Sequence, residues 1–270
     1  MKMAFKSISS VTRNGNGLSC HAGGHQSSAR VVCISDTHNR FRELTIPNGD
    51  IMIHAGDITR RGYLFELKDF NDWLSTLPHK HKLVISGNHE LSVDPISKDE
   101  NPRFQPEDEA EKNLSSDDYK KVLTNCTYLE FSSVNLFGWK IFGFPFSLIH
   151  NDTRWAFQAK RGSQEHFDMI SSLPSDIDIL ISHGPPYGVG DSTIRGTNEG
   201  DDELRKHVEE RIKPKFHIFG HIHESYGIWT NGETTFINAA STGFPRSNLT
   251  LNEPIVFDIP INNLKITDSS

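Results

Sequence analysis

The sequence predicts a layered α/β fold, and two observations support this prediction. Short apolar, β-branched runs alternate along the chain with segments whose apolar residues recur at helical spacing. Five of the apolar runs end abruptly in Gly, Asp, Asn or His. Strands joined by helices are typical of sheets covered by helices, and α/β proteins place their chemistry at strand ends. The same pattern therefore indicates both the architecture and the position of a site.

Three strands and one helix are expected in the first third of the chain. Apolar runs predict the strands, and Leu and Phe at helical spacing predict the helix. In order, these elements are strand 31–35, strand 50–54, helix 63–76 and strand 82–86. The strands run into three polar turns, which are Asp36-Thr37-His38, Gly56-Asp57 and Gly87-Asn88-His89-Glu90.

The second part of the chain begins with an acidic segment, residues 94–118. It contains three Pro and shows no sustained period, so we expect a long loop, with a short helix inside it as an alternative. Long loops of this kind often act as lids. Residues 147–161 are also expected to be a loop. The other expected elements are a helical turn near 117–123, strands 127–131, 134–137 and 140–144, helix 165–173, strand 176–182, helix 201–212, and strands 215–219, 234–238 and 254–259. Two of these strands run into His183 and into Gly220-His221-Ile222-His223.

One domain, residues 30–262, is expected between two tails. The chain of 270 residues shows no internal repeat and no linker. Residues 1–29 are rich in Ser, Gly and His and are expected to be disordered, and residues 263–270 are expected to form a short C-terminal tail. The net charge of -7 and the absence of a basic stripe argue against long nucleic acids as partners. The oligomeric state is left open.

The compartment expected from the sequence is the cytoplasm. No apolar run approaches the roughly 18 residues of a membrane span, and the first residues carry no apolar core of a secretory signal. Three unpatterned Cys indicate a reducing compartment. Import into an organelle is the alternative, because basic residues but no Asp or Glu precede Asp36.

The polar residues at the five strand ends are candidate metal ligands. All are oxygen or imidazole donors, which suit Mn, Fe, Zn or Mg. Setting His89 aside, seven donors remain, too many for one ion but suited to two ions that share a carboxylate, as in phosphoryl displacement. Each motif taken alone also fits a plain turn or helix cap. The candidates are Asp36, His38, Asp57, Asn88, His89, His183, His221 and His223.

The spacing of these candidates indicates how they would reach the ions. Residues i and i+2 of a strand point the same way, so Asp36 and His38 are expected to reach one ion together. Gly220 lets the backbone turn, so His221 and His223 are expected to serve different ions.

The five motifs resemble those of the calcineurin-like metallophosphoesterases, and most closely the metallophosphoesterase-domain-containing (MPPED) branch. The resemblance covers roughly residues 30–260. It implies two mixed β-sheets packed face to face as a sandwich with helices outside, an αββα arrangement. The stretches similar to the branch are 34–38, 70–73, 182–186, 222–224, 226–228 and 254–260.

The resemblance also implies a role for each candidate. One ion would be held by Asp36, His38, Asp57 and His223, and the other by Asp57, Asn88, His183 and His221, with Asp57 bridging. His89 would protonate the leaving oxygen. Some vertebrate members lack the residue that corresponds to His221 and are expected to be poor catalysts, so its presence here implies a competent enzyme.

The expected function is therefore a dinuclear metal-dependent phosphodiesterase. Its small substrates would be phosphodiesters or nucleotides, cyclic nucleotides included, attacked at phosphorus by a metal-bridging hydroxide. Mn is the first metal expected, with Fe, Zn and Mg as alternatives. Two other functions stay open, which are a broad phosphomonoesterase and a slow or inactive nucleotide-binding scaffold.

One departure from the family concerns the second motif. In the protein-phosphatase branch it reads Gly-Asp-x-x-Asp-Arg-Gly, whereas Arg60 takes the acidic place here. This difference argues against a protein phosphatase. It also means that the second motif supplies no carboxylate partner for His89. Substrate contacts are expected from Asn88, His89, Arg61 and His150, although Arg61 also fits an exposed residue at a helix start. His150 and Trp155 are candidates to stack on a base.

Overall fold

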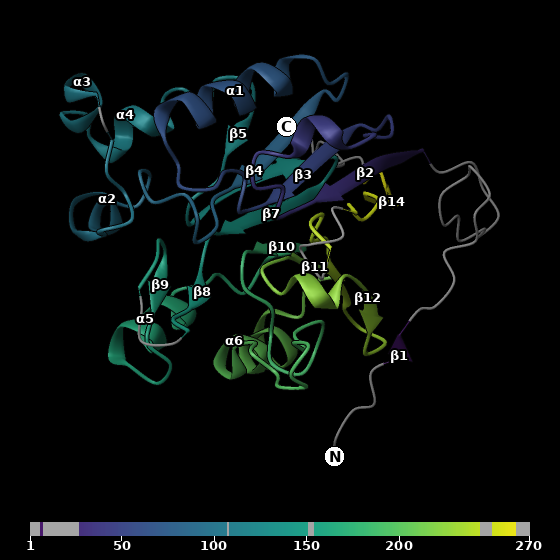
Figure 1. Cartoon of the computed structure of the whole chain (residues 1–270). Helices are drawn as coiled ribbons and strands as arrows, with labels where there is room; N and C mark the ends of the chain where they lie inside the picture. Colours follow the sequence, from purple (N-terminus) through teal and green to yellow (C-terminus); the bar gives the residue numbers. More distant parts are fainter. Residues whose placement is uncertain (1–5, 8–26, 107, 151–153, 244–249, 263–270) are drawn as a thin grey trace, which may run out of the picture.

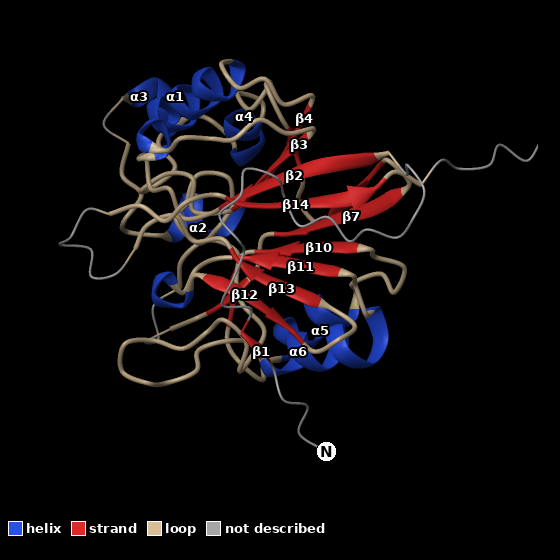
Figure 2. Ribbon diagram, turned by 90° about the vertical axis from the view of Figure 1, so that its right-hand side faces the viewer, coloured by secondary structure: helices blue, strands red, loops and turns tan. Residues whose placement is uncertain are grey.

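Two β-sheets pack face to face, with helices on their outer sides (Figure 2). The computed structural model describes residues 6–7, 27–106, 108–150, 154–243 and 250–262. The five-stranded sheet has the order β14 (Ile255–Pro260), β2 (Ser28–Ile34), β3 (Ile51–Ala55), β4 (His81–Ile85) and β5 (Thr127–Tyr128). Strands β2 to β5 are parallel, and β14 is antiparallel to β2. The sandwich expected from the resemblance is confirmed.

The larger sheet has seven strands and is mixed. Its order is β1 (Lys6–Ser7), β12 (Gly227–Thr230), β13 (Thr235–Asn238), β11 (Phe216–Phe219), β10 (Ile179–Ser182), β7 (Trp139–Phe144) and β6 (Ser132–Leu136). The four central strands β13, β11, β10 and β7 run parallel to one another. Strand β12 was not expected from the sequence. Its four residues are all half-buried in the structure, and such a strand does not need the apolar run that marks a buried one.

Helices cover the outer face of each sheet (Figure 1). On the side of the five-stranded sheet lie α1 (Leu64–Ser75), α3 (Glu109–Lys112) and α4 (Ser116–Lys120). On the side of the larger sheet lie α5 (Gln164–Ser171) and α6 (Asp202–His207), and α6 continues into a π-turn at Val208–Ile212. Within the described residues, no helix is long and apolar enough to cross a membrane.

Three apolar clusters hold these layers together. The cluster between the sheets joins Ile53 of β3 to Ile141 of β7 and Ile218 of β11. Because neighbouring strand residues face opposite ways, Met52 lies instead in the cluster between the five-stranded sheet and Phe70 of α1. A third cluster packs α5 and α6 on the larger sheet. Strands buried on both faces explain why the apolar runs show no alternation.

The helical turn expected near 117–123 is confirmed by α4, but the acidic segment expected to be a long loop contains further short helices, which corrects that prediction. It contains α2 (Pro95–Glu100) before α3 and α4. Pro95 begins α2, while the side chains of Asp108 and Ser115 cap the first turns of α3 and α4. Helices of one turn arise from such capping and are too short to show an apolar period.

The loop expected at 147–161 contains a small parallel sheet of its own. Its two strands are β8 (Ser147–Leu148) and β9 (Gln158–Ala159). The predicted tails 1–29 and 263–270 lie mostly outside the described residues, apart from β1 and the start of β2 at Ser28. The domain boundaries stay a prediction.

Candidate metal centre

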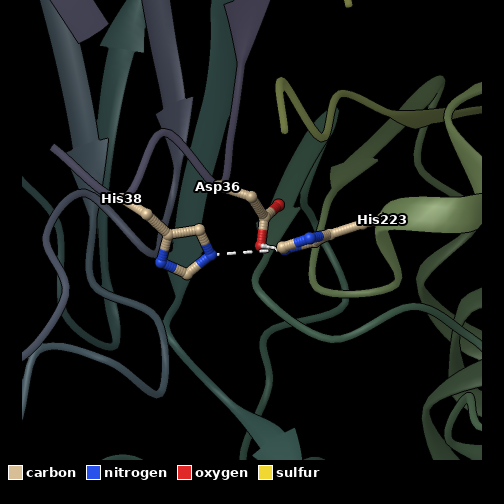
Figure 3. A group of neighbouring side chains, drawn as sticks. All are labelled: Asp36, His38 and His223. Atoms are coloured by element: carbon tan, nitrogen blue, oxygen red, sulfur yellow. Dashed lines mark hydrogen bonds and ion pairs between the residues drawn. The ribbon is translucent and has the colours of Figure 1, made fainter. Parts of the chain in front are cut away.

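Turns that follow five strands bring three groups of possible ligands together. Within each group, one ligand atom per residue lies within 4.8 Å of the others. Figure 3 shows the first group, in which Asp36 and His38, from the turn after β2, point toward His223, which follows β11. The groups are Asp36, His38 and His223; His38, Asp57 and His89; and Asp57, His183 and His221.

Asp57 lies between two sets of imidazoles and presents one oxygen to each. Its Oδ2 is 3.7 Å from His38 Nε2, and its Oδ1 is 3.3 Å from His183 Nε2. The same His183 nitrogen lies 3.0 Å from Asn88 Oδ1. A carboxylate with its two oxygens facing two ligand sets is suited to bridge two ions.

The nitrogen and oxygen atoms that meet in the centre fit metal ions. His38 Nε2 and His223 Nε2 are 3.3 Å apart, and His223 Nε2 is 3.2 Å from Asp36 Oδ1. His221 Nε2 is buried without a hydrogen-bond partner among the described residues. A buried polar atom left without a partner is costly, and a divalent ion would satisfy it. The donor set, oxygen and imidazole without thiolate, suits the borderline and hard ions expected from the sequence.

Left-handed backbone turns direct the ligand side chains. The expectation that Asp36 and His38 point the same way because they alternate along a strand is therefore wrong. Strand β2 ends at Ile34, and Asp36 and His38 have φ of 53° and 42°, in the left-handed region. They meet through this turn, rather than by alternation along a strand. Asp57 and His221 are also left-handed, with φ of 53° and 69°. Such strained residues gather at functional sites.

Backbone carbonyls of one turn orient three of the imidazoles. His183 Nδ1 contacts the Ala55 carbonyl at 2.9 Å, and His38 Nδ1 contacts that of Thr59 at 3.2 Å. His89 Nδ1 contacts the Arg60 carbonyl at 2.9 Å. Each Nδ1–H donates to a carbonyl, which leaves Nε2 directed into the site. The sequence offered no carboxylate partner for His89 in the second motif, and in the structure a main-chain oxygen takes that place. A pattern of side chains in the sequence cannot reveal such a partner.

Burial and mutual charge set the protonation of the ligands. Burial lowers the pKa of His38 to about 3 and that of His221 well below its ordinary value. Burial alone would raise the pKa of Asp57, but the charge of His183 holds it well below its usual range. Burial lowers the pKa of His183, yet the Asp57 carboxylate raises it more, to about 9. Metal binding would therefore have to release the His183 proton.

A family model described as calcineurin-like phosphoesterase matches residues 29–225. The chain belongs to the calcineurin-like phosphoesterase family. A UPF0046 protein of Caenorhabditis elegans is 40% identical over 248 residues, which cover 87% of this chain and 83% of that protein. Metallophosphoesterase domain-containing protein 1 of Homo sapiens is 39% identical over 237 residues, which cover 86% of this chain and 71% of that protein. The family and branch expected from the motifs are confirmed.

A solved structure of the same fold supports the architecture. Phosphopantetheinyl hydrolase (PptH) from Mycobacterium tuberculosis aligns with a TM-score of 0.51 and 13% identity, over 86% of this chain and 96% of that one. At this identity the likeness concerns the fold alone. Family membership makes the chain a phosphoester hydrolase, and the clustered His and Asp side chains fit the dinuclear metal dependence of the family.

The structure gives Glu90 a role that was not predicted from the sequence, although the residue itself belongs to the Gly-Asn-His-Glu motif. Its buried carboxylate accepts hydrogen bonds from the backbone of Asp57 (3.0 Å), Thr59 (2.9 Å) and Gly87 (2.7 Å). The Thr59 hydroxyl donates a fourth bond at 2.9 Å. Glu90 thereby ties the turn that carries Asp57 to the turn that carries Asn88.

Replacing Glu90 by alanine should destabilise the protein by about 2–4 kcal/mol, because three buried backbone N–H groups lose their acceptor. Urea unfolding followed by circular dichroism measures this change. The Glu90→Gln variant is the matched control, and its smaller loss is expected because one oxygen acceptor remains. An unchanged urea midpoint in Glu90→Ala would contradict the tying role.

The structure also shows where two of the residues expected to contact the substrate lie. His150 lies over His221, with ring centroids 5.3 Å apart, and its Nδ1 is 3.3 Å from a Glu199 carboxylate oxygen. Arg61 lies on the ring of Trp155. A groove of about 500 Å³ opens beside His223 and is lined by polar side chains that include Ser192, Tyr226 and Asn252.

Proposed function

We propose that this phosphoesterase is a dinuclear metal-dependent phosphodiesterase acting on nucleotides, cyclic nucleotides included. The observation that carries the proposal is an imidazole held beside the shared carboxylate. His89 Nε2 is 3.9 Å from Asp57 Oδ2, and its ring is oriented through Nδ1. Neither of the two proposed ligand sets needs His89, so it is free to serve the reaction.

The proposed ligand sets follow the two sides of Asp57. Two divalent ions, with Mn the first choice, would supply charge for the phosphate oxygens and acidify a water molecule. One would be held by Asp36, His38, Asp57 and His223, and the other by Asp57, Asn88, His183 and His221.

His89 supplies the proton in this proposal. With Nδ1–H bonded to the Arg60 carbonyl, a protonated ring directs its second N–H, on Nε2, into the site. An alkoxide leaves phosphorus poorly, so protonation of the leaving oxygen by this N–H favours diester cleavage. Arg61 and His150 are proposed to contact the substrate as well.

A small substrate fits the surroundings of the site. The groove beside His223, of about 500 Å³, lies within the range of small-molecule pockets. The net charge of -7 disfavours a long nucleic acid. Both features favour a nucleotide over a polymer.

The test is to strip the purified protein of metal, reload it with Mn²⁺, and compare hydrolysis of a chromogenic phosphodiester with the matching monoester. We expect diester cleavage that a chelator abolishes. Cleavage of the monoester alone would replace the proposal by a phosphomonoesterase. Two bound ions with no cleavage of either ester would replace it by a nucleotide-binding scaffold.

A further inference from the structure

Two arginines meet at one tryptophan next to His89. The ring of Trp155 contacts that of His89, with centroids 4.5 Å apart and planes inclined by 34°. The guanidinium carbon of Arg61 lies 4.8 Å from the centroid of the Trp155 ring, and that of Arg103 lies 5.0 Å from it. Both distances are within the range of cation–π attraction. Three elements remote in sequence thus place two positive charges beside the proposed proton donor.

Neither guanidinium has an acidic partner in the part of the chain that the structure describes. Arg61 donates to the Arg60 carbonyl at 2.8 Å, the same oxygen that holds His89 Nδ1. The nearby Glu66 carboxylate accepts from the backbone N–H groups of Arg60 and Arg61, not from their side chains. A guanidinium has five N–H donors, so most of those at this place remain available to a ligand.

The backbone around this cluster is tied to the metal centre. The N–H of Ala156 donates to the Asn88 carbonyl at 3.1 Å. Asn101 donates to the Arg154 carbonyl at 3.0 Å and accepts from the N–H of Arg103 at 3.0 Å. These bonds join the segment after α2, the segment before β9 and the Asn88 turn. Arg103 and Trp155 are therefore presented on an ordered frame, which lowers the cost of binding.

We propose that Arg61, Arg103 and Trp155 form a subsite for a second anionic group, carried by the leaving group of an acyclic phosphodiester substrate. This inference rests on the proposed function, because His89 is taken to protonate the leaving oxygen and the subsite lies against His89. The ring of Trp155 serves here as a platform for two cations, so a base could stack on it only by displacing a guanidinium. The substrate class is a phosphodiester whose leaving group bears a carboxylate or a further phosphate, which guanidinium groups bind well.

The test uses two aryl phosphodiesters that differ in one group. The leaving phenol carries a meta-carboxylate in one and a neutral meta-carboxamide of similar size in the other. With the Mn²⁺-loaded wild type, kcat/KM should favour the carboxylate ester by about tenfold, the size of one charge-assisted hydrogen bond. In Arg103→Met this preference should largely disappear, so that kcat/KM falls more for the carboxylate ester than for the carboxamide ester.

Arg154→Met is the matched control, because Arg154 is the neighbour of Trp155 in sequence but pairs with Glu165 at 3.4 Å. It should keep the full preference. Raising the ionic strength should reduce the preference of the wild type without any mutation. Equal kcat/KM for the two esters in the wild type, or a preference unaltered in Arg103→Met, would overturn the subsite.

Failure of the proposed function has a different signature, namely no Mn²⁺-dependent cleavage of either ester by the wild type. The subsite is then judged by binding alone. Quenching of tryptophan fluorescence by meta-hydroxybenzoate should require about tenfold more ligand in Arg103→Met than in the wild type, with meta-hydroxybenzamide as the neutral control. Equal binding of the benzoate by both proteins would overturn the subsite.

Discussion

Replacing Asp57 by alanine is expected to remove both divalent ions from the protein. Asp57 presents Oδ2 to His38 and Oδ1 to His183, so one carboxylate would serve both ligand sets. Without Asp57, the set with Asp36 keeps one carboxylate, and the set with Asn88, His183 and His221 keeps none. The loss of the ions should reduce kcat/KM by more than about 10³-fold, because metal ions contribute several kcal/mol of charge stabilisation.

Metal content per chain, measured by mass spectrometry after dialysis, checks this expectation. Wild-type protein should retain two ions and Asp57→Ala none. Asp36→Ala is the informative control, because Asp36 approaches His223 but belongs to only one of the two proposed sets. It should lose one ion and keep the other. Two ions retained in Asp57→Ala would rule out the bridging assignment.

Replacing His89 by alanine should leave both ions in place and still remove most of the activity on diesters with poor leaving groups. His89 is held by the Arg60 carbonyl and lies against Trp155, but it belongs to neither proposed ligand set. Loss of a proton donor costs about 10²–10⁴-fold. The loss should be much smaller for a 4-nitrophenolate leaving group, which needs no proton to depart.

The decisive measurement is kcat for an alkyl and a nitrophenyl diester, in wild type and His89→Ala, together with metal content. His81→Ala is the control, because His81 lies on β4 against Phe137, with ring centroids 5.5 Å apart. It should behave as the wild type with both esters. An equal loss of kcat for both esters in His89→Ala would exclude proton donation to the leaving group.

Most strands of the two large sheets and the kinds of candidate ligand could be predicted from the sequence, because both depend on local features. Apolar runs such as the one that forms β4 show where the chain is buried. The polar residues directly after these runs show where a turn begins. The short helices α2 and α3 could not be predicted in this way, whereas α4 overlaps the helical turn expected near 117–123. Helices α2 and α3 begin at Pro95 and at the cap Asp108, and both are too short to show an apolar period.

The sequence by itself determined the α/β layering, the family, and the order in which donors such as Asp57 and His183 follow buried strands. Only the tertiary structure decided how those donors meet: the left-handed turns at Asp36 and His221, the Arg60 carbonyl that holds His89, and the contact of two arginines with Trp155. The physical reason is the distance along the chain over which each feature is determined. Residue type and apolar period are properties of a few neighbouring residues, whereas the direction of a carbonyl or a guanidinium depends on how distant segments pack.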